Sequence, residues 1–318
     1  MSKLKIAVQM DPPELLDKKA DSTLALMEEA IKRFYKVSIY HVEDLTLENN
    51  TPKVFCKQVK NIDITKKNYI SLSEESKKSL SSFDVVLIRQ DPPFNMKYIT
   101  ATYLLEKIKG KTLVLNNPSS IRNSPEKLLV TNFYDLMPPT LVSRNIKEIN
   151  NFLSIHKKSI IKPLYGNGGK DVFLTSLNDP NLSVIIEKFL EYEEHFIVQK
   201  FINDVSKGDK RILLINGEPV GAINRMPNEK QVRANLHIGG RAVKTKLTKK
   251  DMIICKKIKK TLQEKNLFFA GIDVIDNYLT EINVTSPTGI REIEAFSNNN
   301  IAEKTWQIIE KNATKLCK

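Results

Sequence analysis

Short apolar runs alternate with amphipathic stretches along the first 120 residues. Apolar or β-branched runs bounded by polar residues are typical of strands, and helix-like stretches between them indicate strand–helix–strand units. The pattern therefore predicts a parallel α/β sheet in this part of the chain. The expected strands are 3–10, 37–42, 83–90 and 112–117, and the expected helices are 22–33 and 97–108.

After about residue 126 the pattern changes to strands and helices that predict a compact α+β unit. A β-hairpin follows at 209–225, with Asn216 and Gly217 at its turn. The other expected helices are 146–156, 184–190, 249–265 and 302–312, and the other expected strands are 159–164, 172–175, 195–201, 268–275 and 278–284.

Composition and charge narrow the class of protein. Hydrophobic residues make up 41% and charged residues 27%, which are globular values. The net charge of +13 is spread along the chain and mixed with acids, and aromatic residues are only 7%, so a lysine-rich surface or small anionic substrates are favoured over nucleic acid. No membrane span and no secretory signal are predicted, so we expect a cytoplasmic location with Cys56, Cys255 and Cys317 as reduced thiols.

The segment 268–284 predicts a hairpin with one chemically distinct face. If residues 276–278 form a three-residue loop, Asp273 lies opposite Glu281, and Asn283 shares their face. Two carboxylates and an amide oxygen without histidine or cysteine suit Mg²⁺ rather than zinc. A solvated hairpin face is the alternative, but two adjacent like charges without a cation are unfavourable.

A glycine-containing loop, YGNGGKD, follows the expected strand 159–164. Gly166, Gly168 and Gly169 let backbone N–H groups approach phosphate oxygens closely. Alone, the loop is more simply a hairpin turn, and Lys127 alone is a solvated helix residue. Lys162, at the end of that strand, adds a charge above the loop and strengthens a phosphate-binding interpretation.

Further candidates lie at other strand ends. The strand 195–201 has backbone groups that an adenine ring could use, and Asp209 and Arg211 follow it. In the first sheet, two strands end in Asp-Pro-Pro, at Asp11 and at Asp91, where ligands of parallel sheets bind. Each charge alone is an ordinary surface residue, and each Asp-Pro-Pro alone is a turn.

The order of these features resembles the ATP-grasp ligases, and more closely the bacterial-type glutathione synthetases. The resemblance runs along nearly the whole chain, and the last of its motifs is the most specific. The motifs are MDPP, RQDPPF, NNPSSIRNSPEKL, KPLYGNGG, GDKR, IGGR, GIDVI and TEINVTSPTGIREIE. The resemblance implies an N-terminal α/β domain at 1–124, followed by a two-lobed ATP-grasp fold with a central lobe at 125–202 and a C-terminal lobe at 203–318.

The resemblance also implies the reaction and its cofactors. Glycine would be ligated to γ-L-glutamyl-L-cysteine with ATP and Mg²⁺ or Mn²⁺, through an acylphosphate, in a homotetramer. Asp273, Glu281 and Asn283 would hold the metal. The implied ATP-binding residues are Lys127, Lys162, Gly166, Asn167, Gly168, Gly169, Gln199, Lys200, Phe201, Ile202, Asp209 and Arg211.

Other residues receive roles in the reaction from the same resemblance. Arg211, Arg233 and Arg241 would stabilise the transferring phosphoryl group, under a lid at 226–240 that excludes water. The implied substrate-binding residues are Asp11, Lys18, Arg89, Asp91, Ser286, Thr288 and Arg291.

Two rival functions are weaker. Another ATP-grasp ligase, for D-alanine or for glutamate addition, would share the nucleotide half but not the segments RQDPPF and TSPTGIRE. A non-catalytic nucleotide-binding or RNA-binding protein would not need the acidic face of 273–283, whose carboxylates repel phosphates without a metal.

Overall fold

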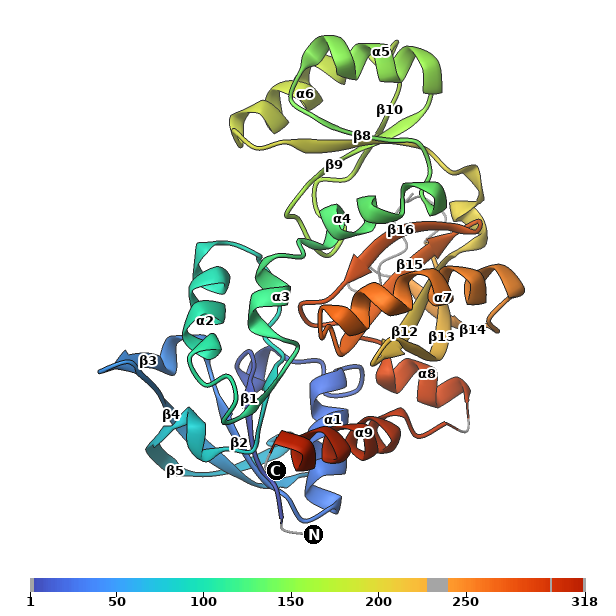
Figure 1. Cartoon of the computed structure of the whole chain (residues 1–318). Helices are drawn as coiled ribbons and strands as arrows, with labels where there is room; N and C mark the ends of the chain where they lie inside the picture. The colour runs from blue at the N-terminus through green and yellow to red at the C-terminus, as the bar shows by residue number, and fades with distance from the viewer. Residues whose placement is uncertain (1–2, 228–239, 298, 317–318) are drawn as a thin grey trace.

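The computed structural model describes residues 3–227, 240–297 and 299–316, and in these residues three β-sheets follow one another along the chain (Figure 1). The predicted boundaries after residues 124 and 202 fall between elements, and they stay a prediction. No described helix is long and apolar enough to cross a membrane.

The first sheet contains the predicted parallel strands. They lie in the order β2 (Lys36–Tyr40), β1 (Lys5–Gln9), β6 (Val85–Ile88) and β7 (Leu113–Leu115). Helices α1 (Ser22–Lys32) and α2 (Met96–Glu106) form where the pattern predicts them, and Asp21 caps α1 by accepting a hydrogen bond from Leu24 N at 2.7 Å.

The same sheet continues into an antiparallel part that the sequence pattern did not predict. It consists of β3 (Leu45–Glu48), β4 (Thr51–Ile62) and β5 (Ile70–Ser79), which pair antiparallel. The sheet is therefore mixed, and the expectation of a parallel sheet holds only for the other strands. β5 reads ISLSEESKKS and has no buried residue, so it lacks the apolar alternation by which a strand is recognised.

The second sheet, in the middle of the chain, has the order β10-β9-β11-β8. Apolar side chains of its two helices, such as Leu153 and Phe189, pack against Ile161 and Val198 of the strands. The elements are β8 (Thr140–Ser143), α5 (Ile146–His156), β9 (Ser159–Pro163), β10 (Phe173–Thr175), α6 (Leu182–Glu191) and β11 (Phe196–Lys200).

The third sheet is antiparallel and has the order β14-β13-β12-β15-β16. Ile254, Ile258 and Leu262 of α7 (Lys249–Glu264) belong to the core that includes the inward side chains of β12 and β15. The strands are β12 (Asp209–Ile215), β13 (Glu218–Met226), β14 (Arg241–Lys244), β15 (Phe269–Ile275) and β16 (Tyr278–Asn283).

The β15–β16 hairpin has the predicted register but a different turn. Asp273 pairs with Glu281 and Gly271 with Asn283, as expected. The expected three-residue loop is wrong, because Ile275 pairs with Tyr278 and the turn contains only Asp276 and Asn277, at φ +44° and +68°. A bulge at Thr280 takes up the remaining residue and restores the register.

The last helix returns to the first sheet. Figure 1 shows α9 (Ile301–Leu316) lying beside α1, near the start of the chain. Trp306 is fully buried in this contact and donates from Nε1 to Leu26 O at 2.8 Å. The remaining short elements are α3 (Pro118–Arg122), α4 (Glu126–Leu129), α8 (Ile290–Phe296) and the 3₁₀ segments Pro13–Leu15, Val42–Asp44, Leu80–Ser82, Val130–Leu136 and Asn203–Lys207.

Candidate active site

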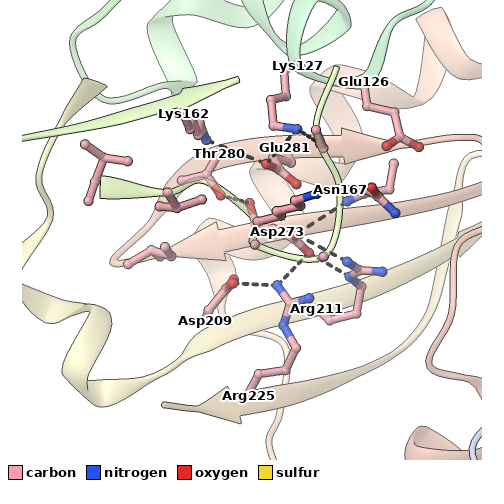
Figure 2. A pocket seen from close by; sticks show the side chains of 18 of the residues that line it. Glu126, Lys127, Lys162, Asn167, Asp209, Arg211, Arg225, Asp273, Thr280 and Glu281 are labelled. Atoms are coloured by element: carbon pink, nitrogen blue, oxygen red, sulfur yellow. Dashed lines mark hydrogen bonds and ion pairs between the residues drawn. The ribbon is translucent and has the colours of Figure 1, made fainter. Parts of the chain in front are cut away.

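A cavity of about 390 Å³ lies where the three sheets meet. Its wall is formed by the loop after β6, by α4, by β9 and the glycine loop, by the end of β11, by strands of the third sheet and by the turn 285–289 after β16. Figure 2 shows part of this lining, around Glu281 and Asp273. Most of the predicted site residues line it: Asp91, Lys127, Lys162, Gly166, Asn167, Gly168, Gly169, Gln199, Lys200, Phe201, Ile202, Asp209, Arg211, Asp273, Glu281, Asn283, Ser286 and Thr288.

The predicted metal face is on the floor of this cavity. Asp273 and Glu281 are opposite each other on β15 and β16, and Asn283 donates to Asp273 Oδ2 at 3.4 Å and to Gly271 O at 3.2 Å. The Asn283 amide nitrogen is used in these bonds, so its oxygen remains for a ligand. Among the described residues, no group of three or more His, Cys, Asp or Glu side chains could hold a metal ion by itself. A set of two carboxylates and one amide oxygen fits Mg²⁺ that completes its shell with phosphates and water.

Asp273 is held by two buried arginines. Arg211 Nε donates to its Oδ1 at 2.6 Å, and Arg225 Nη2 lies 3.0 Å from the same oxygen. Burial alone would raise the pKa of Asp273, but the two guanidinium groups bring the pKa down to about 2. Asp273 is therefore ionised at neutral pH.

Asp209 is the other carboxylate that Arg225 contacts. Burial raises the pKa of Asp209 to about 6, although Arg225 opposes the shift. Its Oδ1 is buried and has no hydrogen-bond partner among the described residues. That oxygen is free to accept a hydrogen bond from a ligand hydroxyl.

Two lysines converge above Glu281 (Figure 2). Lys162 Nζ lies 3.6 Å and Lys127 Nζ 3.8 Å from Glu281 Oε1, and both side chains are buried. Lys127 also donates to Gly166 O of the glycine loop. Burial lowers the pKa of Lys162. The charge of Glu281 raises this pKa, and the charge of Lys127 lowers it further. A polyanion entering the cavity would relieve this crowding of positive charge.

The glycine loop has a backbone that only glycine adopts easily. Gly168 and Gly169 have φ +61° and +74°, in the left-handed region. On β11, Gln199 donates to Thr140 Oγ1 at 2.8 Å. The N–H groups of Lys200 and Phe201 donate to Pro139 O and Lys158 O, so the expected use of these two donors by adenine has no support.

The two Asp-Pro-Pro segments meet, because they follow the neighbouring strands β1 and β6. Asp91 N donates to Asp11 Oδ2 at 2.7 Å. Arg89 is buried behind the cavity, where it donates to Thr23 Oγ1 at 3.2 Å and to Pro287 O at 3.0 Å. Arg89 thus holds the turn 285–289.

Other predicted residues lie apart from the cavity or outside the described residues. Arg291 donates to Asp21 O and Glu28 and so connects α8 to α1. Lys18 donates to Lys66 O, and Arg241 is exposed at the start of β14. Arg233 and most of the predicted lid 226–240 lie outside the described residues.

Several cavity residues were not predicted, among them the polar residues Glu126, Arg225 and Thr280. Glu126 Oε1 accepts hydrogen bonds from Val284 N at 2.7 Å, Thr285 N at 3.0 Å and Thr285 Oγ1 at 2.8 Å. Arg225 could have been found from the hairpin register, because β13 pairs it with Asp209. Nothing in the sequence separates Glu126 from a solvated glutamate.

The chain is similar to known proteins over nearly its whole length. Two family models match it: the N-terminal domain of prokaryotic glutathione synthetase over residues 4–122, and the ATP-grasp domain of prokaryotic glutathione synthetase over residues 126–298. The glutathione synthetase of Agrobacterium fabrum is 48% identical over 98% of this chain and 98% of its own length. That of Buchnera aphidicola subsp. Baizongia pistaciae is 42% identical over 98% of this chain and 97% of its own length.

Solved structures share the fold at low sequence identity. A D-cycloserine synthetase superposes with a TM-score of 0.70 at 15% identity and covers 98% of this chain and 99% of its own. D-alanyl-alanine synthetase A from Vibrio cholerae gives a TM-score of 0.62 at 13% identity and covers 99% of each chain. At these identities the likeness concerns the fold alone.

Proposed function

The chain belongs to the prokaryotic glutathione synthetase family and is an ATP-dependent ligase with glutathione synthetase function, and from this premise we propose which of its residues bind each substrate and the metal ion. The substrates in this proposal are ATP, γ-L-glutamyl-L-cysteine and glycine. The observation that carries it is one cavity that combines an acidic face, two buried lysines, a glycine loop and the turn 285–289.

The reaction has two steps in this proposal. A carboxylate oxygen of the cysteine residue forms a bond to the γ-phosphorus of ATP while the bond to ADP breaks, which gives an acylphosphate. The free amine of glycine then bonds to the acyl carbon, phosphate leaves with its C–O bond electrons, and the amine loses a proton. Such transfers depend on positioning and charge neutralisation, and no enzyme nucleophile is needed.

We assign the nucleotide to the region around the glycine loop. Lys127 and Lys162 would bind its phosphates, and the backbone of Gly166–Gly169 would cover the γ-phosphate. Gln199–Ile202 and Asp209 would line the adenosine site, and the unpartnered Asp209 Oδ1 supports a bond to a ribose hydroxyl.

Asp273, Glu281 and Asn283 would hold the divalent metal ion, either Mg²⁺ or Mn²⁺. When bound, such an ion neutralises part of the triphosphate charge. Arg211 lies against Asp273 and would add positive charge toward the transferring phosphoryl group. The roles of Arg233, Arg241 and a lid at 226–240 stay predictions.

The γ-glutamyl end is assigned to the ends of β1 and β6. Asp11, Asp91 and Arg89 lie there together, and Ser286 and Thr288 line the adjoining wall. The substrate roles of Lys18 and Arg291 stay predictions, because their hydrogen-bond partners are protein groups outside the cavity. A cytoplasmic location and a homotetramer belong to the same proposal and rest on family resemblance.

Phosphate release tests the substrate assignment directly. The enzyme is given ATP, Mg²⁺ and glycine, together with γ-glutamylcysteine, D-alanine or glutamate in separate reactions. We expect release only with γ-glutamylcysteine. Turnover with D-alanine alone would overturn the assignment, and salt-sensitive nucleic-acid binding without turnover would favour the RNA-binding rival.

A further inference from the structure

Some carboxylates of the cavity form ion pairs with described arginine or lysine side chains, and others do not. Asp209 and Asp273 contact arginines, and Glu281 contacts two lysines, all within 4 Å. Asp91 and Glu126 line the same cavity, and neither forms an ion pair with a described residue. Glu126 is half-buried, whereas Asp91 is exposed and has the charge of Arg89 nearby. A carboxylate that forms no ion pair within the protein suits a positively charged ligand group.

Glu126 uses only one of its two oxygens within the protein. Oε1 accepts all three hydrogen bonds from Val284 and Thr285, and Oε2 has no hydrogen-bond partner among the described residues. Burial raises the pKa of Glu126, although those hydrogen bonds oppose the shift. The Tyr98 hydroxyl is buried nearby without a partner among the described residues, and the charge of Glu126 adds to burial in raising its pKa.

The positions of the two carboxylates differ along the cavity. Asp91 lies with Asp11 at the ends of β1 and β6, where the γ-glutamyl end is assigned. Glu126 precedes Lys127 on α4, and Figure 2 shows it beside Lys127 at the cavity wall, with Glu281 near them. Glu126 is therefore close to the groups assigned to the phosphates, where the acylphosphate would form.

We propose that Glu126 Oε2 binds the ammonium group of the incoming amino acid, glycine. The inference rests on the proposed function, in which two substrates each carry one ammonium group. Asp91 would take the ammonium of the γ-glutamyl residue, and Glu126 would take that of glycine. The carboxylate then has two tasks: Oε1 fixes the turn that lines the substrate site, and Oε2 positions the amine beside the acyl carbon.

The substitution Glu126→Gln separates these two tasks. Three donors face Oε1, so the amide oxygen would stay there and the NH₂ group would point into the cavity, where it cannot accept a hydrogen bond from an ammonium group. We expect the KM for glycine to rise about 10- to 100-fold, the effect of losing a hydrogen bond to a charged group. The KM values for ATP and γ-glutamylcysteine should stay within about threefold of the wild type.

An uncharged amine provides the second measurement. Hydroxylamine carries no charge at neutral pH and captures acylphosphates as hydroxamates. The Glu126→Gln variant should form γ-glutamylcysteine hydroxamate at a rate within about threefold of the wild type, because this nucleophile does not need an anionic site. A rate that falls as much with hydroxylamine as with glycine would overturn the proposal.

Two control variants separate a binding role from a structural one. Asp91→Asn should raise the KM for γ-glutamylcysteine and leave that for glycine within about threefold. Thr285→Val removes one donor to Oε1 but keeps Oε2, so it should not raise the KM for glycine selectively. Equal increases for all substrates in Glu126→Gln and Thr285→Val would identify Glu126 as a purely structural residue and contradict the inference.

The wild-type enzyme offers a test that needs no variant. Glycolate has a hydroxyl in place of the ammonium group of glycine. As a competitive inhibitor, it should therefore have an inhibition constant at least about tenfold higher than the KM for glycine. An inhibition constant of glycolate equal to the KM for glycine would overturn the ammonium site and leave the proposed ligase function intact. Failure of the wild type to release phosphate with γ-glutamylcysteine would instead overturn the proposed function and this inference together.

Discussion

Glu281 receives both buried lysines of the cavity and shares the acidic face with Asp273. Glu281→Gln removes this charge, so the proposed metal site loses one carboxylate and the lysines lose their counter-charge. We expect ATP-dependent phosphate release to fall roughly 100-fold or more, the effect of losing one electrostatic group at a reacting centre.

The control for this substitution is Glu187→Gln, which changes an exposed glutamate of α6. That variant should retain wild-type phosphate release. Activity of Glu281→Gln within about tenfold of the wild type would argue against a role in metal or phosphate binding.

Arg225 is the buried cation shared by Asp209 and Asp273. Arg225→Met leaves Asp209 without its only described ion-pair partner, so we expect the free energy of unfolding to fall by about 3–5 kcal/mol in urea titrations at pH 7. Arg144→Met, at an exposed position, should change it by less than about 0.5 kcal/mol. Equal stability of the two variants would show that the buried pairs contribute little.

Cys255 and Cys56 are buried thiols away from the cavity lining. Burial raises the pKa of Cys255 to about 12 and raises that of Cys56, so both are protonated and weakly nucleophilic at neutral pH. We expect neither to react with iodoacetamide in the native enzyme at pH 8, and both to react in urea, as followed by peptide mass spectrometry. Rapid modification of either cysteine in the native state would contradict this.

The role of a single charged residue can be predicted from the sequence only where local structure fixes its position. Glu281 and Asp273 could be predicted because the hairpin register fixes their shared face. Glu126 could not, because its importance comes from Val284 and Thr285, more than 150 residues later in the chain. Contacts of this kind depend on tertiary structure, which local pattern does not encode.

Among the elements, the sequence predicted the long helices and the apolar strands, and it missed the polar strands and the short helices α3, α4 and α8. The segments 22–33 and 146–156 have clear apolar periodicity and asparagine or aspartate caps, and α1 and α5 form there. β5 has neither feature, and it forms a strand through its pairing with β4. The bulge at Thr280 was missed for a related reason: one extra residue in a hairpin leaves no signal in the pattern.

Helix α7 begins with a capping box. Thr248 Oγ1 accepts a hydrogen bond from Asp251 N at 3.1 Å, and Asp251 accepts one from Thr248 N at 2.7 Å. Thr248→Ala should lower the free energy of unfolding by about 1 kcal/mol without changing the KM for ATP, as measured by urea titration and steady-state kinetics. Thr245→Ala, just before the cap, is the matched control, and an equal loss there would contradict the capping role.

For the whole molecule, the cavity is the feature that sequence pattern alone could not supply. Its walls come from segments as far apart as Asp91 and Thr288, and only the resemblance to a known family brought them together in advance. Contacts between distant segments hold these walls together. Arg89 connects the first sheet to Pro287, and Lys127 connects α4 to the glycine loop and to Glu281.

The packing of α9 on α1 is central to the stability of the molecule. Trp306 is fully buried there, and Arg33 forms an ion pair with Glu310 at 2.6 Å. Trp306→Ala should lower the free energy of unfolding by about 3–5 kcal/mol through the cavity that it leaves. Circular dichroism during urea titration would measure the loss, and Gln307→Ala, on the exposed side of the helix, should lie within about 0.5 kcal/mol of the wild type.

The contact between α9 and α1 can form only late in the synthesis of the chain. Strand β1 and helix α1 emerge early from the ribosome, but their apolar surface includes the place that Trp306 and Ile309 occupy. Until the final helix emerges, this surface stays uncovered and open to wrong associations or to chaperones. Chaperones should therefore capture nascent chains stalled before residue 301 more readily than chains that include α9.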